Sequence, residues 1–129
     1  MYIETSAIVA ILTGEVEAPE LLLRLEGSGE PFTSVVTKVE AALVIGKAMS
    51  DFIRGAEVVE EFLNRLGVRT DGVSAELYHE VMKAAAAYGK GSGHAAKLNF
   101  GDCFSYAAAK QAKTTLLYKG DDFSRTDLG

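Results

Sequence analysis

The sequence predicts an α/β fold in which helices cover a short, mostly parallel sheet. Short apolar, β-favouring segments alternate along the chain with longer segments whose apolar residues recur at helical spacing. Such alternation is typical of βαβ units, whose strands lie parallel. The length of 129 residues and the hydrophobic share of 48% suit a single domain over residues 1–129 with one core.

The first part of the chain is expected to form a strand and two helices. The strand, Met1–Ile3, runs directly into an apolar helix that Thr5 or Ser6 would cap. Gly14 would end that helix. A second helix is expected over Pro19–Leu25, because proline is favoured in the first turn of a helix.

The middle of the chain continues the alternation. Phe32–Ser34 is typical of a brief strand or turn, and helical spacing follows over Val35–Met49. The next helix is expected over Ala56–Leu66, whose apolar residues share one face. Gly67–Thr70 is a candidate strand.

The last part supplies two further helices and a strand. Ser74 is expected to cap a helix whose apolar stripe extends to Tyr88. The glycine-rich stretch Gly89–His94 would then form a flexible loop, and Asn99–Asp102 would open a sixth helix. Thr114–Tyr118 is a clear strand.

Composition and charge narrow the class of protein. The 13 Lys and Arg residues against 18 Asp and Glu residues give a net charge of −5, which argues against a protein that holds nucleic acid mainly through surface charge. An enzyme that cuts nucleic acid with bound cations stays open. The sequence contains no run of about 18 apolar residues, so we expect no membrane span. The N-terminus lacks the positively charged region of a secretory signal. The single cysteine, Cys103, favours a reducing, cytoplasmic location.

Several acidic residues stand in apolar surroundings. Glu4 directly follows the first strand, Glu40 lies within VVTKVEAALVI, and Asp102 opens an apolar helix. Asp121 and Asp122 follow the last strand. Burying a carboxylate is unfavourable unless it is paired, hydrogen-bonded or bound to a cation. Each acid alone is explained by a helix cap, a solvated face or a turn.

Together these acids indicate a metal site. Glu4 and the Asp121–Asp122 pair follow strands, so they would lie at the carboxyl edge of a parallel sheet, where α/β proteins bind ligands. Asp102 and Glu40 lie on helices that can face the same edge. Because few lysines lie beside them, Mg²⁺ or Mn²⁺ would relieve their repulsion best. Such a cluster suits hydrolysis of a phosphodiester bond.

Competing motifs do not match. The Gly89–Gly93 loop matches neither the P-loop nor the GxGxxG pattern. His79 and His94 lack zinc-site spacing, and Cys103 is expected to be a packed thiol. A receiver domain needs an acidic pair after the first strand, and an Asp-x-Asp phosphatase needs two aspartates there. The segment Glu4–Ser6 provides neither.

A small basic patch lies in and after the glycine-rich loop. It consists of Lys90, His94 and Lys97. One interpretation is that these residues only keep the protein soluble. The other is that they are candidate RNA contacts that bind a substrate phosphate beside the acids.

The sequence resembles the PIN-domain family, and within it the VapC-type ribonuclease toxins of bacterial toxin–antitoxin pairs. The resemblance covers nearly the whole chain and rests on four motifs in order. They are MYIETSAIVAIL with Glu4, TSVVTKVEAALVI with Glu40, LNFGDCFSYAAAK with Asp102 and LLYKGDDFSRTDL with Asp122.

The resemblance implies an α/β/α sandwich and Mg²⁺- or Mn²⁺-dependent endonucleolytic cleavage of RNA. Glu4 and Asp102 would be metal ligands, and Glu40 would ligate the metal or orient the attacking water. Asp122 would complete the cluster. Asp121, next to Asp122, would be a supporting residue. Thr5 or Ser6 would support the site through hydrogen bonds within it.

The resemblance also implies protein partners. We expect a homodimer, inhibited by a cognate antitoxin whose C-terminal segment occupies the acidic groove. DNA would be contacted only through the antitoxin. Four leucines of the second predicted helix are candidates for an antitoxin or dimer surface, or simply for packing: Leu21, Leu22, Leu23 and Leu25.

One residue departs from the family pattern, because the first acid is normally Asp and here is Glu4. The extra methylene moves the carboxylate by roughly 1.5 Å, and misplacements of about 1 Å reduce the activity of such sites. Two hypotheses follow: an endoribonuclease with reduced activity, or a catalytically inactive PIN-like domain that acts as a binding module.

Overall fold

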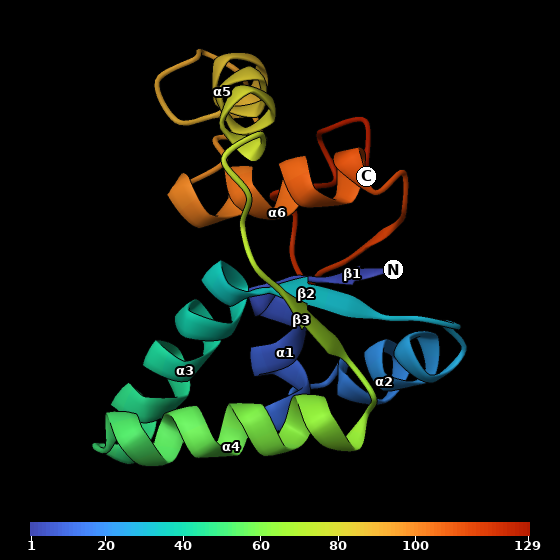
Figure 1. Cartoon of the computed structure of the whole chain (residues 1–129), viewed down its shortest axis with the longest axis vertical. Helices are drawn as coiled ribbons and strands as arrows, with labels where there is room; N and C mark the ends of the chain where they lie inside the picture. Colours follow the sequence, from blue (N-terminus) through green and yellow to red (C-terminus); the bar gives the residue numbers. More distant parts are fainter.

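The computed structural model describes all 129 residues and contains a four-stranded parallel sheet between two layers of helices (Figure 1). The strand order is β3-β2-β1-β4. Tyr2 in the central strand β1 pairs with Phe32 of β2 on one side and with Leu116 of β4 on the other. The α/β class is therefore confirmed. The strands are β1 (Tyr2–Ile3), β2 (Phe32–Ser34), β3 (Arg69–Asp71) and β4 (Leu116–Leu117).

Six helices cover the two faces of the sheet. Four of them form the lower layer of Figure 1, whereas α6 lies on the upper face with α5 packed above it. No helix combines the length and the apolarity that crossing a membrane requires. The lower helices are α1 (Thr5–Leu12), α2 (Ala18–Glu26), α3 (Val35–Met49) and α4 (Phe52–Arg65), and the upper helices are α5 (Leu77–Tyr88) and α6 (Phe100–Gln111).

The sheet separates two hydrophobic clusters rather than bordering one core. Because side chains alternate along a strand, Tyr2 and Leu116 belong to the cluster with α5 and α6, whereas Ile3 and Leu117 belong to the cluster with α1 to α4. Burial on both faces explains why β1 and β4 are continuously apolar in sequence, whereas the edge strand β3 is polar and largely exposed.

The cap expected for α1, at Thr5 or Ser6, is wrong, whereas Asn99 opens α6 as expected. Glu4 itself caps α1, because its Oε2 accepts a hydrogen bond from the backbone N–H of Ser6 at 2.7 Å. At α6 the cap is Asn99, whose Oδ1 accepts from the N–H of Asp102 at 2.8 Å. Asp102 therefore lies within the first turn of the helix rather than at its cap.

Other boundaries also differ from prediction, and β3 is Arg69–Asp71 rather than residues 67–70. Helix α4 begins at Phe52 rather than Ala56, since Asp51 caps it through the N–H of Arg54 at 3.0 Å. Helix α5 begins at Leu77 with no side-chain cap, because the carbonyl of Ser74 accepts from Leu77 in a preceding turn. The strand expected over residues 114–118 is only Leu116–Leu117.

Candidate active site

The four candidate acids meet at the carboxyl edge of the sheet. Glu4 follows β1, α3 with Glu40 follows β2, and the segment after β4 carries Asp122. The pKa of Glu4 is raised partly by Asp102 and Glu40, and that of Asp102 partly by Asp122 and Glu40. Such coupling requires short distances, so the fold brings together residues from all parts of the chain.

Glu4 is the most deeply buried of these acids, with only 4% of its surface exposed. Burial raises the pKa of its carboxyl group to about 7, although two hydrogen bonds from Ser6 act in the opposite direction. Both bonds reach Oε2, from the Ser6 backbone N–H at 2.7 Å and from its hydroxyl at 2.5 Å. The second oxygen, Oε1, accepts no hydrogen bond.

Asp102 is buried as well, at 7% exposure, and is held by its own helix terminus. The backbone N–H of Asn99 donates to its Oδ2 at 3.0 Å, which completes a capping box. Burial raises the pKa of Asp102, while Lys90 lowers it. Oδ1 accepts no hydrogen bond.

Glu40 is half-buried and lies against α6. The hydroxyl of Thr5 donates to its Oε1 at 3.0 Å, and burial raises its pKa. A Cβ atom added at Gly101 would overlap the carboxyl group of Glu40. Gly101 therefore permits the close approach that brings Glu40 beside Asp102.

The two aspartates after β4 are exposed. Asp122 acts on the pKa of Asp102, whereas Asp121 is not among the groups that shift any of the buried acids. The carbonyl of Asp121 accepts from the Ser124 hydroxyl at 2.7 Å in a turn. Of the pair, Asp122 is the member that adjoins the cluster.

Ser6 connects the site to the segment after β4. Its hydroxyl donates to Glu4 and accepts from the backbone N–H of Lys119 at 2.8 Å. The ammonium group of Lys119 is engaged elsewhere, with Glu15 at 2.7 Å and Glu17 at 3.6 Å. No lysine or arginine forms an ion pair with Glu4, Glu40 or Asp102.

The donor set suits a hydrated divalent cation. In each of the three carboxylates one oxygen is held by a hydrogen bond and the other is free, namely Glu4 Oε1, Glu40 Oε2 and Asp102 Oδ1. No three His, Cys, Asp or Glu side chains are arranged closely enough to enclose an ion. Mg²⁺ needs no such cage, since it keeps several waters and takes one or two carboxylates.

The candidate phosphate-binding residues line one hollow of about 430 Å³ in the loop before α6. The structure thus brings Lys90, His94 and Lys97 together, and Lys90 is the one whose charge reaches Asp102. His94 is fixed, because its Nδ1 accepts from the Ala96 N–H at 3.0 Å and its ring packs edge-on against Tyr88 at 4.8 Å.

Two contacts that position these acids were not predicted from the sequence. The contact between Asn99 and Asp102 has a local signal, because an asparagine three residues before an acid at a helix start is a capping signal. Gly101 had no local signal, since its partner Glu40 is distant in sequence.

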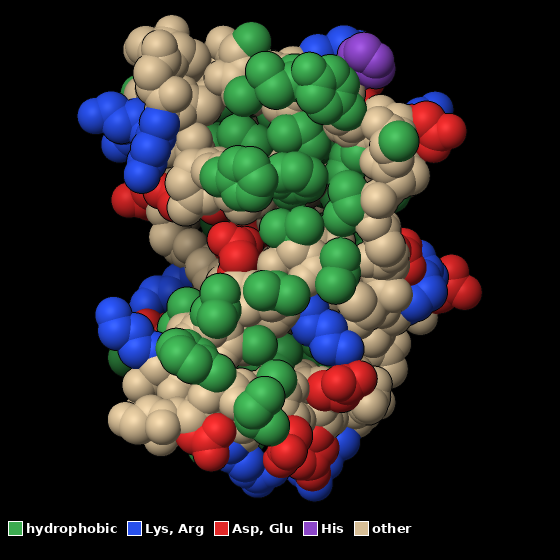
Figure 2. Space-filling view, turned by 60° about the vertical axis from the view of Figure 1, so that its left-hand side comes forward, with side chains coloured by type: hydrophobic (Ala, Val, Ile, Leu, Met, Phe, Trp, Pro, Cys, Tyr) green, Lys and Arg blue, Asp and Glu red, His purple; other side chains and the backbone are tan.

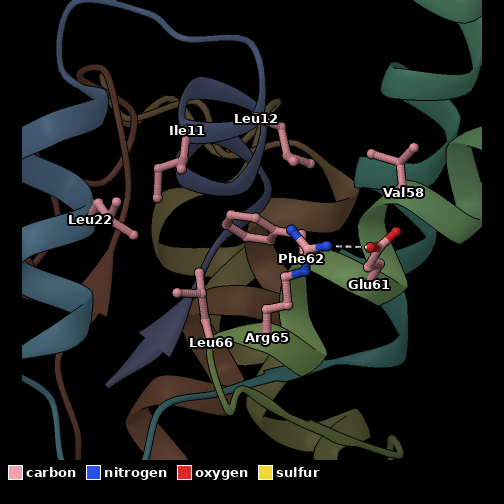
Figure 3. Close-up of a pocket in the computed structure, with 8 residues that line it drawn as sticks. All are labelled: Ile11, Leu12, Leu22, Val58, Glu61, Phe62, Arg65 and Leu66. Carbon is pink, nitrogen blue, oxygen red and sulfur yellow. Dashed lines mark hydrogen bonds and ion pairs between the residues drawn. The ribbon is translucent and has the colours of Figure 1, made fainter.

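The leucines of α2 divide between core and surface. Leu21 and Leu25 are 4% and 2% exposed, so their interpretation as a partner surface is wrong. Leu23 is 71% exposed. Leu22 lines an apolar hollow of about 320 Å³ between α1, α2 and α4 (Figure 3). The other apolar residues around it are Ile11, Leu12, Val58, Phe62 and Leu66, and an Arg65–Glu61 ion pair of 2.7 Å flanks them.

Comparison with known proteins shows the family of the chain. The family model of the PIN domain matches residues 1–128. A VapC ribonuclease of Rhizobium meliloti (strain 1021) is 41% identical over 140 residues, covering 99% of both chains. Ribonuclease VapC42 of Mycobacterium tuberculosis is 38% identical over 128 residues, covering 99% of this chain and 96% of the relative.

The fold is also found in a solved toxin. The crystal structure of Mycobacterium tuberculosis VapC20, a sarcin-ricin loop cleaving toxin, matches with a TM-score of 0.71 over 95% of this chain and 92% of that chain. The sequence identity is 18%, so this likeness bears on the fold alone. From the family match and the full-length relatives, the chain belongs to the PIN domain family and, within it, to the VapC ribonuclease toxins.

Proposed function

We propose that this protein is a metal-dependent endoribonuclease that hydrolyses RNA phosphodiester bonds at the acidic cluster. The observation that carries the proposal is the arrangement of Glu4, Glu40 and Asp102, each with one anchored and one free oxygen and none paired with a cationic side chain. The VapC ribonucleases among its relatives support the reaction type.

A bound Mg²⁺ or Mn²⁺ ion would supply a water of lowered pKa and would stabilise the charge that develops on the phosphate. Glu4 and Asp102 would hold the ion through their free oxygens. Glu40, whose pKa burial raises above its ordinary value, would orient the attacking water and accept its proton. Asp122 completes the solvent side of the cluster.

Two groups of residues assist these acids. Thr5 and Ser6 fix the orientation of Glu40 and Glu4 through their hydroxyl groups. Lys90, His94 and Lys97 contact phosphates of the RNA. Because Nδ1 of His94 accepts a hydrogen bond, neutral His94 carries its proton on Nε2, where it can donate to a phosphate oxygen.

Cleavage of a mixed RNA pool tests the proposal. Purified protein should cut RNA in Mn²⁺ but not in EDTA, and Asp102→Asn should abolish cleavage. Cleavage that persists in EDTA or in Asp102→Asn would contradict the proposal.

The same assay with Glu4→Asp examines the departure from the family pattern. We expect this variant to cut faster, because the shorter side chain restores the usual position of the carboxylate. If wild type and Glu4→Asp both fail to cut while still binding a partner, the binding-module hypothesis is correct.

We also propose a homodimer formed through an apolar face. Figure 2 shows apolar side chains gathered along one face that spans the upper and lower helical layers. The exposed apolar residues of α3 and α6 include Val39 and Leu43, each 51% exposed, and Phe100, 79% exposed. Patches of this kind mark protein interfaces. Light scattering should detect a dimer that Val39→Lys converts to a monomer.

A cognate antitoxin is the second proposed partner. The apolar hollow between α1, α2 and α4 (Figure 3) offers it an anchoring surface separate from the acidic cluster. Phe62→Asp should weaken inhibition by the antitoxin while RNA cleavage continues. Full inhibition of a folded Phe62→Asp variant would exclude the hollow.

A further inference from the structure

A chain of buried hydroxyl groups lies beneath the acidic cluster. The Tyr2 hydroxyl hydrogen-bonds with Ser34 Oγ at 2.8 Å and with Thr37 Oγ1 at 2.7 Å. Thr37 Oγ1 hydrogen-bonds in turn with Ser105 Oγ at 3.2 Å. Tyr2, Thr37 and Ser105 are 0% exposed. The chain therefore joins β1, β2, α3 and α6 in the interior.

The two helical members stand one turn from candidate catalytic acids. Thr37 precedes Glu40 by three residues on α3, and Ser105 follows Asp102 by three residues on α6. Residues three apart lie on nearly the same face of a helix. The Thr37–Ser105 contact thus joins the faces of α3 and α6 that present the two carboxylates.

Such a contact is more specific than apolar packing. A hydrogen bond between hydroxyl groups has a defined length and direction, and buried polar networks that are fully satisfied make a core rigid. No buried side-chain nitrogen or oxygen lacks a partner in this protein. Methyl groups in the same places would fill the space without fixing the relative position of the helices.

We propose that Thr37 and Ser105 are positioning residues whose hydroxyl–hydroxyl contact sets the separation of Glu40 and Asp102 for cation binding. This inference rests on the proposed function. It assigns a role in the metal site to two side chains that touch neither the ion nor the RNA.

The test measures binding of Mn²⁺ alone through the metal-induced rise in melting temperature, followed against Mn²⁺ concentration. Thr37→Val keeps the shape of the side chain and removes its hydroxyl, and Ser105→Ala does the same from the α6 side. Each should raise the half-saturating Mn²⁺ concentration by about tenfold or more, as loss of supporting contacts does at metal sites. Thr37→Ser, which retains the hydroxyl, should restore wild-type binding.

Thr33→Val is the matched control. Thr33 is also a 0% exposed threonine, but its hydroxyl donates to the Ile3 carbonyl at 2.8 Å within the sheet and does not join α3 to α6. It should lower the melting temperature without a comparable change in Mn²⁺ affinity. Because both proposed residues act through one contact, the double variant Thr37→Val/Ser105→Ala should bind no more weakly than the weaker single variant.

The outcomes separate the two levels of the proposal. Unchanged Mn²⁺ affinity in Ser105→Ala and Thr37→Val, or equal weakening in Thr33→Val, would overturn the positioning role while leaving the metal site intact. A wild-type protein that shows no response to Mn²⁺ would instead overturn the proposed function itself.

Discussion

The acidic cluster has a buried half and an exposed half, built from the same residue types. Glu4 and Asp102 are 4% and 7% exposed, and each accepts a backbone N–H. Glu40 is half-buried and accepts one hydroxyl, and Asp122 is exposed with no hydrogen bond to its carboxylate. Backbone groups hold the buried carboxylates in place even though burial opposes their charge.

This difference in burial indicates which acids contribute most to metal binding and which most affect the stability of the fold. The buried pair holds a fixed position but carries most of the unfavourable energy of like charges out of water. The more exposed pair is held by fewer hydrogen bonds, and burial raises the pKa of Glu40 as well. We therefore expect changes in the buried half to have larger effects on both metal binding and stability.

The largest effect is expected from Asp102→Asn. Asparagine can still accept the N–H of Asn99, so the helix start is preserved while the charge is lost. Metal affinity should fall by about 100-fold or more. At a metal concentration 100 times its dissociation constant, wild type should gain about 2.7 kcal/mol of stability, and Asp102→Asn should gain almost none. Thermal unfolding with and without Mn²⁺ measures this difference. A full metal-induced rise in melting temperature would show that Asp102 is not a ligand.

The next largest effect is the contribution of Glu4 to the pH dependence of stability in the absence of metal. Its pKa is about 7 in the folded protein and 4.5 in an ordinary environment. Between these values the unfolded chain loses its proton before the folded one, so stability falls as pH rises. The difference in pKa corresponds to about 3 kcal/mol for this group.

Glu4→Gln should remove that part of the pH dependence. Chemical denaturation in EDTA should therefore find the variant more stable than wild type near about pH 8 and closer to it near about pH 4. The raised pKa values of Glu40 and Asp102 act in the same direction and should persist in the variant. Parallel stability curves for wild type and Glu4→Gln would contradict the assignment.

Gly101→Ala should have an intermediate effect. Its methyl group would displace the Glu40 carboxylate from α6, so we expect metal affinity to fall by about tenfold. Gly29→Ala is a suitable control, because a Cβ there meets nothing within 4 Å. Equal metal affinity in both variants would mean that the approach of Glu40 to α6 is unimportant.

The smallest effect is expected from Asp122→Asn. The exposed carboxylate acts on Asp102 through solvent-screened charge, so metal affinity should fall by less than about tenfold. Asp121→Asn, next to it, should change even less. An effect of Asp122→Asn as large as that of Asp102→Asn would remove the distinction between the two halves.

Part of this site was predictable from local signals. The positions of Glu4 and Asp122 at the sheet edge were predictable because apolar runs in the sequence show where strands end. The position of Asp102 was predictable because the composition of the segment shows where a helix starts. The caps were less predictable. Thr5 and Ser6 are good capping residues by type, yet their hydroxyl groups bond to Glu40 and Glu4.

The parallel α/β architecture, the order of its elements and the family motifs follow from the amino-acid sequence, because they depend on apolar periodicity and short-range spacing. Which acids are buried, the contact of Gly101 with Glu40 and that of Thr37 with Ser105 became known from the folded structure alone. Burial and the contacts between α3 and α6 arise from packing at the edge of the sheet, where residues distant in sequence meet. No local pattern encodes such distances.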